Sequence, residues 1–141
     1  MDSATFLQIA KAVVSNPAFA AQGQVTFCNF AAQLITNAVF GYSGFDGLNA
    51  NQIYNLVSGS GNWLKVDGST AQLHANGGHL AICSQVGQPH GHVSVIVPGN
   101  MVPSEHFGHA APLTANVGEL NAIVGANWGF SVEPGYFVLA S

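Results

Sequence analysis

Charged side chains are scarce in this sequence. Only 6% of its 141 residues are charged, two residues are Lys or Arg, and the formal net charge is −4. Proteins that bind nucleic acid neutralise the phosphate backbone with clusters of Lys and Arg. We therefore expect no nucleic-acid partner, and a folded chain whose surface is polar mainly through uncharged groups such as Ser, Asn and Gln.

Long apolar runs are also absent. Asn, Gln, Gly or Pro interrupts every apolar stretch before it reaches the roughly 18 residues that a membrane-spanning helix needs. The acidic Asp2 stands where a signal peptide would carry positive charge. We therefore expect no membrane partner and no secretory leader in this chain.

Cysteine is limited to two residues, which allow one disulfide at most and cannot staple a small scaffold. Cys83 ends the apolar run Leu80–Cys83, a setting typical of a buried, inert thiol. The length of the chain suits one domain over residues 1–141, with a core that needs neither disulfides nor a structural metal.

Apolar residues recur at helical spacing in the first half of the sequence. The pattern predicts a first helix that has Ser3 as its cap and ends at Asn16-Pro17. It predicts a second helix from about Phe27 to Val39 with Thr26 as its cap. A third helix is predicted over Leu48–Val57, with Asn49 at its start. The second helix is expected to bury one face, formed by Phe27, Phe30, Ala31, Leu34, Ile35 and Ala38.

The second half changes to short apolar or alternating runs that Gly and Pro separate. These predict strands at Leu80–Gln85, His92–Val97, Leu113–Val117 and Tyr136–Leu139. Helices followed by strands indicate an α+β domain, in which N-terminal helices pack on a small antiparallel sheet.

Cys28 lies in the first turn of the second predicted helix. Unpaired backbone N–H groups and the positive end of the helix dipole stabilise a thiolate at such a position. The same N–H groups can hold an oxyanion, so one element would both activate and assist an acyl-transfer nucleophile. Cys28 is therefore the candidate nucleophile.

A base must come from one of six histidines, and His92 is the best placed. It opens a predicted strand directly after Gly91, which lets a substrate or another backbone approach the imidazole. In Leu113–Val117 the alternation puts Asn116 on the polar face, so Asn116 can orient His92 if the two strands pair. Asn127 is the competing third residue.

In these segments the chain resembles NlpC-type and CHAP-type cell-wall cysteine peptidases and amidases, which include amidase effectors of type VI secretion and some phage lysins. The resemblance is carried by the helix start Thr26–Phe30, a segment with Trp63, the strand start Gly77–Leu80 and the strand Gly91–Ile96, in that order. It covers roughly residues 20–140, and its sharpest parts are the Cys-Asn and Gly-His-Val neighbourhoods.

The resemblance implies a papain-like fold with Cys28 as nucleophile, His92 as base and Asn116 as the orienting residue. Many NlpC-type members have His at the third position, so Asn116 departs from them and matches the Cys-His-Asn set of papain-like enzymes. The implied activity is hydrolysis of amide bonds in peptidoglycan stem peptides through a thioester, without a metal or cofactor. We expect a bacteriolytic monomer that is secreted or delivered to the periplasm or cell wall, with an immunity protein as partner only if it is an interbacterial toxin.

Two other functions remain open from the sequence. One is a zinc hydrolase that uses the histidine cluster, in which His90, His92, His106 and His109 lie close together in the sequence. The other is a non-enzymatic cell-wall binding module in which aromatic side chains such as Trp63 and Trp128 contact a sugar or a partner.

Overall fold

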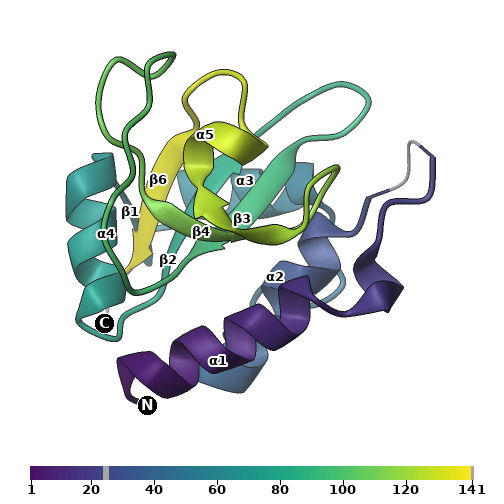
Figure 1. Ribbon diagram of the computed structural model, residues 1–141, viewed down its shortest axis with the longest axis horizontal. Coiled ribbons are helices and arrows are strands. Elements are labelled where there is room, and N and C mark those ends of the chain that lie inside the picture. The colour runs from purple at the N-terminus through teal and green to yellow at the C-terminus, as the bar shows by residue number, and fades with distance from the viewer. Residues whose placement is uncertain (24–25, 141) are drawn as a thin grey trace.

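The computed structural model describes residues 1–23 and 26–140, and the strands in this part of the chain form one antiparallel sheet (Figure 1). Each strand is short, as expected from runs broken by Gly and Pro. Across the sheet the order is β1-β6-β2-β3-β4-β5. The strands are β1 (Trp63–Val66), β2 (Ala81–Gln85), β3 (His92–Ile96), β4 (Leu113–Asn116), β5 (Ala122–Gly125) and β6 (Gly135–Leu139).

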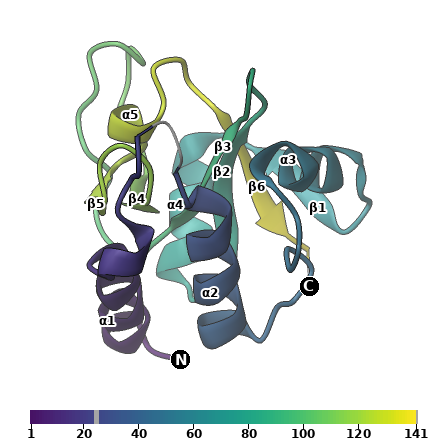
Figure 2. The same cartoon turned by 90° about the vertical axis from the view of Figure 1, so that its right-hand side faces the viewer.

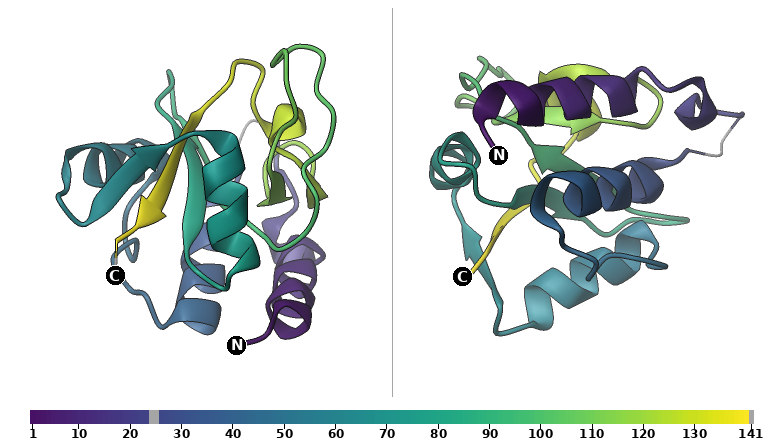
Figure 3. Two further views of the ribbon diagram at one scale, coloured as in Figure 1. Left: turned by 90° about the vertical axis from the view of Figure 1, so that its left-hand side faces the viewer. Right: turned by 90° about the horizontal axis from the view of Figure 1, so that it is seen from below.

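Helices cover both faces of the sheet, which confirms the α+β class. The helices are α1 (Ser3–Val14), the 3-10 turn η1 (Pro17–Phe19), α2 (Cys28–Phe40), α3 (Ala50–Gly59), α4 (Gly68–Asn76) and α5 (Ala126–Gly129). Figure 2 shows α2 in front of the sheet and α4 behind it, and the left view of Figure 3 shows the reverse. None of the helices in the described residues has the length and apolar character needed to cross a bilayer.

Two apolar clusters fill the space on either side of the sheet. The larger one lies between the sheet and α1, α2 and α3, and it holds Val93 and Val95 of β3 together with Ile35 of α2. The smaller one lies under α4 and α5 and includes Ile96 and Phe130. Alternation along β3 therefore sends odd-numbered residues toward α2 and even-numbered residues, His92 among them, toward the other face.

Helix α2 matches its predicted bounds to within one residue, but the predicted buried face was only partly right, because Ala31 and Ile35 are buried whereas Phe30 and Leu34 are not. Phe30 and Leu34 are 51% and 45% exposed, whereas the buried residues are Cys28, Ala31, Ala32, Ile35 and Thr36. The buried stripe is thus displaced by one residue, about 100° around the helix. Small residues on this stripe let α2 approach the sheet closely, and Cys28 becomes part of the core.

Two of the three predicted helix caps were also wrong. Asp2, not Ser3, caps α1, because its carboxylate accepts a hydrogen bond from the backbone N–H of Thr5 at 2.7 Å. The N-cap of α2 is Phe27 rather than Thr26, and within the described residues no side chain caps this helix. The third cap is confirmed, since Asn49 forms a capping box with Gln52 at the start of α3.

Candidate active site

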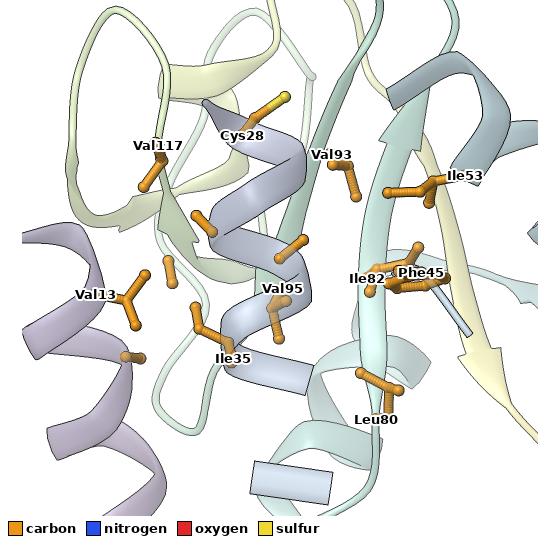
Figure 4. Packing of buried hydrophobic residues seen from close by; sticks show 14 of the residues in the cluster. Val13, Cys28, Ile35, Phe45, Ile53, Leu80, Ile82, Val93, Val95 and Val117 are labelled. Carbon is orange, nitrogen blue, oxygen red and sulfur yellow. The ribbon is translucent and has the colours of Figure 1, made fainter. Parts of the chain in front are cut away.

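Cys28 is the first residue of α2, which confirms its expected place in the first turn. Figure 4 shows its sulfur directed toward the side on which β3 lies, away from Val13 and Ile35. The residue is only 5% exposed. Two hydrogen bonds hold the first turns of α2 against the segment before α3. The side-chain amides of Asn29 and Gln33 both donate to the carbonyl of Leu48, at 3.2 and 3.0 Å.

Burial determines the protonation state of this thiol. Desolvation raises the pKa of Cys28 above 9.0, and the backbone N–H groups of Val93, Asn29 and Cys28 itself lower it only in part. The helix N-terminus therefore lowers the pKa of the Cys28 thiol, as expected, but desolvation raises this pKa by more. At neutral pH Cys28 is a thiol, and it needs a base to become a nucleophile.

The sheet brings His92 and Asn116 together, as the strand-pairing argument expected. β3 pairs with β4 in a register that sets Val95 opposite Ala115 and Ile96 opposite Thr114. Continued toward the start of β3, this register places Asn116 diagonally across from His92 on the same face. The Nε2 of His92 lies 2.8 Å from the Oδ1 of Asn116.

The hydrogen bonds around Asn116 fix the tautomer of His92. The amide nitrogen of Asn116 donates to the carbonyl of Leu120 at 2.6 Å, so its oxygen is the atom that faces the imidazole. The Nε2 of His92 therefore carries the proton and donates it to Asn116. The lone pair is left on Nδ1, which is the atom able to accept a proton from a thiol.

The imidazole is held neutral by its surroundings. Desolvation lowers the pKa of His92 below 6.5, nearby His90 lowers it further, and the hydrogen bond to Asn116 opposes this shift. The ring of Phe130 packs against it with a centroid distance of 4.7 Å. A neutral imidazole with its lone pair on Nδ1 is able to accept a proton.

Two glycines that the sequence analysis did not single out make room for this pair. A Cβ on Gly129 would collide with the Oδ1 of Asn116 and lie 3.0 Å from the Nε2 of His92. A Cβ on Gly118 would lie 3.3 Å from the Cε1 of His92. Gly91 was expected to permit close approach, and a Cβ there would collide with the carbonyl oxygen of Gln85.

The thiol and the imidazole are not in contact within the described residues, because alternation along β3 directs the imidazole to the face opposite the one on which α2 and Cys28 pack. Within residues 1–23 and 26–140, no hydrogen bond joins the sulfur of Cys28 to His92. The sulfur lies instead against the backbone N–H of Val93, the next residue along β3. Catalytic hydrogen bonds are often long in a free enzyme and tighten when substrate binds.

An open pocket of about 600 Å³ lies on the far side of Gly129 from His92, and neither His92 nor Asn116 is among the described residues that line it. Its lining includes Gly129, which contacts both His92 and Asn116, together with the exposed Trp128 and Glu119. Glu119 follows Gly118 and Trp128 precedes Gly129, so each of these pocket residues neighbours a glycine that contacts the imidazole.

The other predicted candidates lie elsewhere. Asn127, the competing third residue, lines the pocket and is not bonded to His92, and in the described part of the chain its Oδ1 is buried without a hydrogen-bond partner. Cys83 is fully buried on β2, as expected, and burial raises the pKa of its thiol strongly. Both Cys28 and Cys83 are free thiols.

The histidines do not converge on a metal-binding arrangement. His106 contacts the carbonyl of Phe130 at 3.2 Å, and His109 pairs with Glu133 at 2.9 Å. Among the residues that the structure describes, no three His, Cys, Asp or Glu side chains gather in a way that can hold a metal ion. The zinc alternative therefore has no set of ligands in this part of the chain.

Comparison with known proteins adds no assignment. No protein-family model matches this chain, and no curated protein matches it either.

Proposed function

We propose that this chain is a papain-like cysteine hydrolase that cleaves an amide bond of peptidoglycan stem peptides. Cys28 is the nucleophile, His92 the base and Asn116 the residue that orients the base. The observation that carries the proposal is the 2.8 Å contact between Nε2 of His92 and Oδ1 of Asn116, in a tautomer that leaves Nδ1 free. A nucleophile at a helix start and an Asn-oriented imidazole on a strand form a set suited to acyl transfer.

The proposed reaction begins from two neutral groups. Nδ1 of His92 takes the proton of the Cys28 thiol as the sulfur attacks the amide carbonyl. The backbone N–H groups of Cys28 and Asn29 already lie close enough to the sulfur to lower the pKa of its thiol, and they stabilise the oxyanion. The imidazolium then protonates the leaving amine, and the C–N bond breaks to give a thioester. Water, deprotonated by His92, hydrolyses the thioester and restores the thiol.

The architecture supports the papain-like part of the proposal. A helix that begins with the nucleophile packs against an antiparallel sheet whose neighbouring strands carry the base and its partner, which is the layout implied by the resemblance to NlpC-type and CHAP-type enzymes. The choice of a cell-wall substrate rests on that resemblance alone.

Digestion of purified peptidoglycan tests the activity. Wild type is expected to release fragments whose masses identify the cleaved bond, and Cys28→Ala is expected to release none. Cys83→Ala is the matched control, because it removes the other thiol, which the mechanism does not use. Equal digestion by Cys28→Ala would overturn the cysteine mechanism, and loss of digestion in a chelator would favour the zinc alternative. Retention on peptidoglycan without release of fragments would favour a binding module.

A further inference from the structure

The pocket beside His92 presents acceptor groups and an aromatic face. Trp128 is 67% exposed, which leaves its indole ring open to a ligand. Glu119 contributes a carboxylate. His106 also lines the pocket, and its Nε2 donates to the carbonyl of Phe130 at 3.2 Å.

Within the described residues, no ion pair involves the carboxylate of Glu119. The chain holds only two Lys or Arg residues, which are Lys11 on α1 and Lys65 on β1, at the sheet edge opposite β5. Among the described residues the ion pair present joins His109 to Glu133. An exposed indole beside an unpaired carboxylate is complementary to a protonated amine, which gains from both the ring face and the negative charge.

The pocket also lies where a substrate would extend from the reacting bond. Gly129 lines the pocket on one side and contacts His92 and Asn116 on the other. In the proposed reaction the bond being cleaved lies against His92, and Gly129 is the residue between His92 and the pocket that Trp128 and Glu119 line.

We infer that this pocket is a substrate subsite for a group that carries a protonated primary amine, with Trp128 and Glu119 as its specificity-determining residues. The inference rests on the proposed function, which makes the chain a hydrolase of peptides, and it narrows the substrate to an amine-bearing peptide. It also accounts for the exposure of Trp128, which packing does not explain.

The two indole N–H signals of the wild-type protein in a ¹H–¹⁵N NMR spectrum provide the test. Trp63 is buried and donates its indole N–H to the hydroxyl of Tyr42 at 3.2 Å, so its signal is an internal control. The probe is Nα-acetyl-lysine N-methylamide, which carries one protonated amine. Its Nε-acetyl derivative and N-acetylglucosamine are the comparison ligands.

The lysine probe is expected to shift the Trp128 signal and leave the Trp63 signal in place. Glu119→Gln should weaken binding of the probe about 3- to 5-fold, as expected for a partly solvated ion pair. Asp46→Asn is the matched control, since it removes the same charge from the loop after α2, outside the pocket. An unshifted Trp63 signal in each variant shows that the variant has folded.

Three outcomes would overturn the subsite. They are an equal shift with the Nε-acetyl derivative, a shift with N-acetylglucosamine in place of the lysine probe, and no shift with any ligand. The peptidoglycan digest separates this inference from the proposed function. Binding of the probe without Cys28-dependent hydrolysis would leave an amine-binding pocket but reject the hydrolase and with it the role as a substrate subsite. Hydrolysis without binding would leave the hydrolase and reject the subsite.

Discussion

Replacement of Asn116 tests the central contact of the site. Asn116→Ala removes an acceptor for the Nε2–H of His92 and a donor to the carbonyl of Leu120, at 2.8 and 2.6 Å. A buried polar group left without its partner costs about 1–3 kcal/mol. Leu120 is 41% exposed and water can replace its lost donor, so the lower end applies there and the total loss is about 2–4 kcal/mol. Against a typical stability of about 5–15 kcal/mol, the variant should still fold.

The pKa of His92 is the more discriminating quantity, because its expected shift has a sign. The hydrogen bond to Asn116 raises the pKa of His92, so Asn116→Ala should lower it further below 6.5. Asn116→Asp keeps an acceptor at Nε2 and adds a negative charge, which should raise the pKa of His92 above that of wild type. Amide hydrolysis should fall in Asn116→Ala, because the ring is no longer held in the tautomer that leaves Nδ1 free.

NMR titration of the His92 imidazole measures these pKa values, and urea unfolding measures the loss of stability. Asn127→Ala is the matched control, since Asn127 lies nearby without a bond to His92. The expected order of the His92 pKa is Asn116→Ala below wild type below Asn116→Asp, with Asn127→Ala equal to wild type. The same His92 pKa in all four proteins would refute the pairing of His92 with Asn116.

Three further predictions follow from burial and packing. Iodoacetamide should label Cys28 more slowly in the folded protein than in the protein unfolded in urea. Because burial raises the pKa of the Cys28 thiol, the labelling rate of the folded protein should still rise with pH above 9.0. A labelling rate that levels off near pH 7 would contradict this. Gly129→Ala should cost roughly 1–3 kcal/mol and reduce hydrolysis, whereas Gly61→Ala, where a Cβ meets open space, should retain both stability and activity in the same unfolding and digestion assays. The pKa of His92 is lower in the folded protein than in the unfolded chain, so the contribution of His92 to the free energy of unfolding is complete above pH 6.5 and is lost as the pH falls through the folded pKa. The urea midpoint of the wild type should therefore decline below pH 6.5, and it should decline less in His92→Gln.

The sequence predicted the elements that carry large apolar residues at a clear period. The four predicted strands and the first three helices are present, because their apolar side chains form the core that defines them. The contact between His92 and Asn116 was also predictable, since alternation placed Asn116 on the polar face and antiparallel pairing of neighbouring strands brings such residues together. The catalytic roles of these residues remain predictions.

The sequence did not predict α4, because its packing uses small residues. Ala71 and Ala75 are fully buried beneath this helix, whereas its one large apolar residue, Leu73, is 71% exposed. The position of the large apolar residue therefore does not indicate the buried side of the helix, and only the Asp67 cap marks the helix start. β1 and β5 were missed because each is a four-residue strand at an edge of the sheet.

The surroundings of His92 depend on contacts between distant segments, which no local pattern encodes. Phe130 and Gly129 reach His92 from more than thirty positions away, and they do so because α5 folds back over the end of β4. A glycine in a Gly-rich stretch gives no sign of which side chain will approach it. The pair could therefore be predicted, but its enclosure and the resulting fall in the pKa of His92 could not.

The orientation of α2 connects the packing of the protein to its proposed chemistry. A helix that buried Phe30 and Leu34 would have turned Cys28 about 100° away from the core, into solvent, where the helix N-terminus alone would lower the pKa of the thiol. The observed orientation buries Ala31, Ala32 and Ile35 against β3 and takes Cys28 with them. The same packing brings the sulfur to the backbone of Val93, beside His92, and withdraws it from water. Close packing thus keeps Cys28 in its thiol form at neutral pH, so in the proposed mechanism His92 must take the proton in the step in which sulfur attacks.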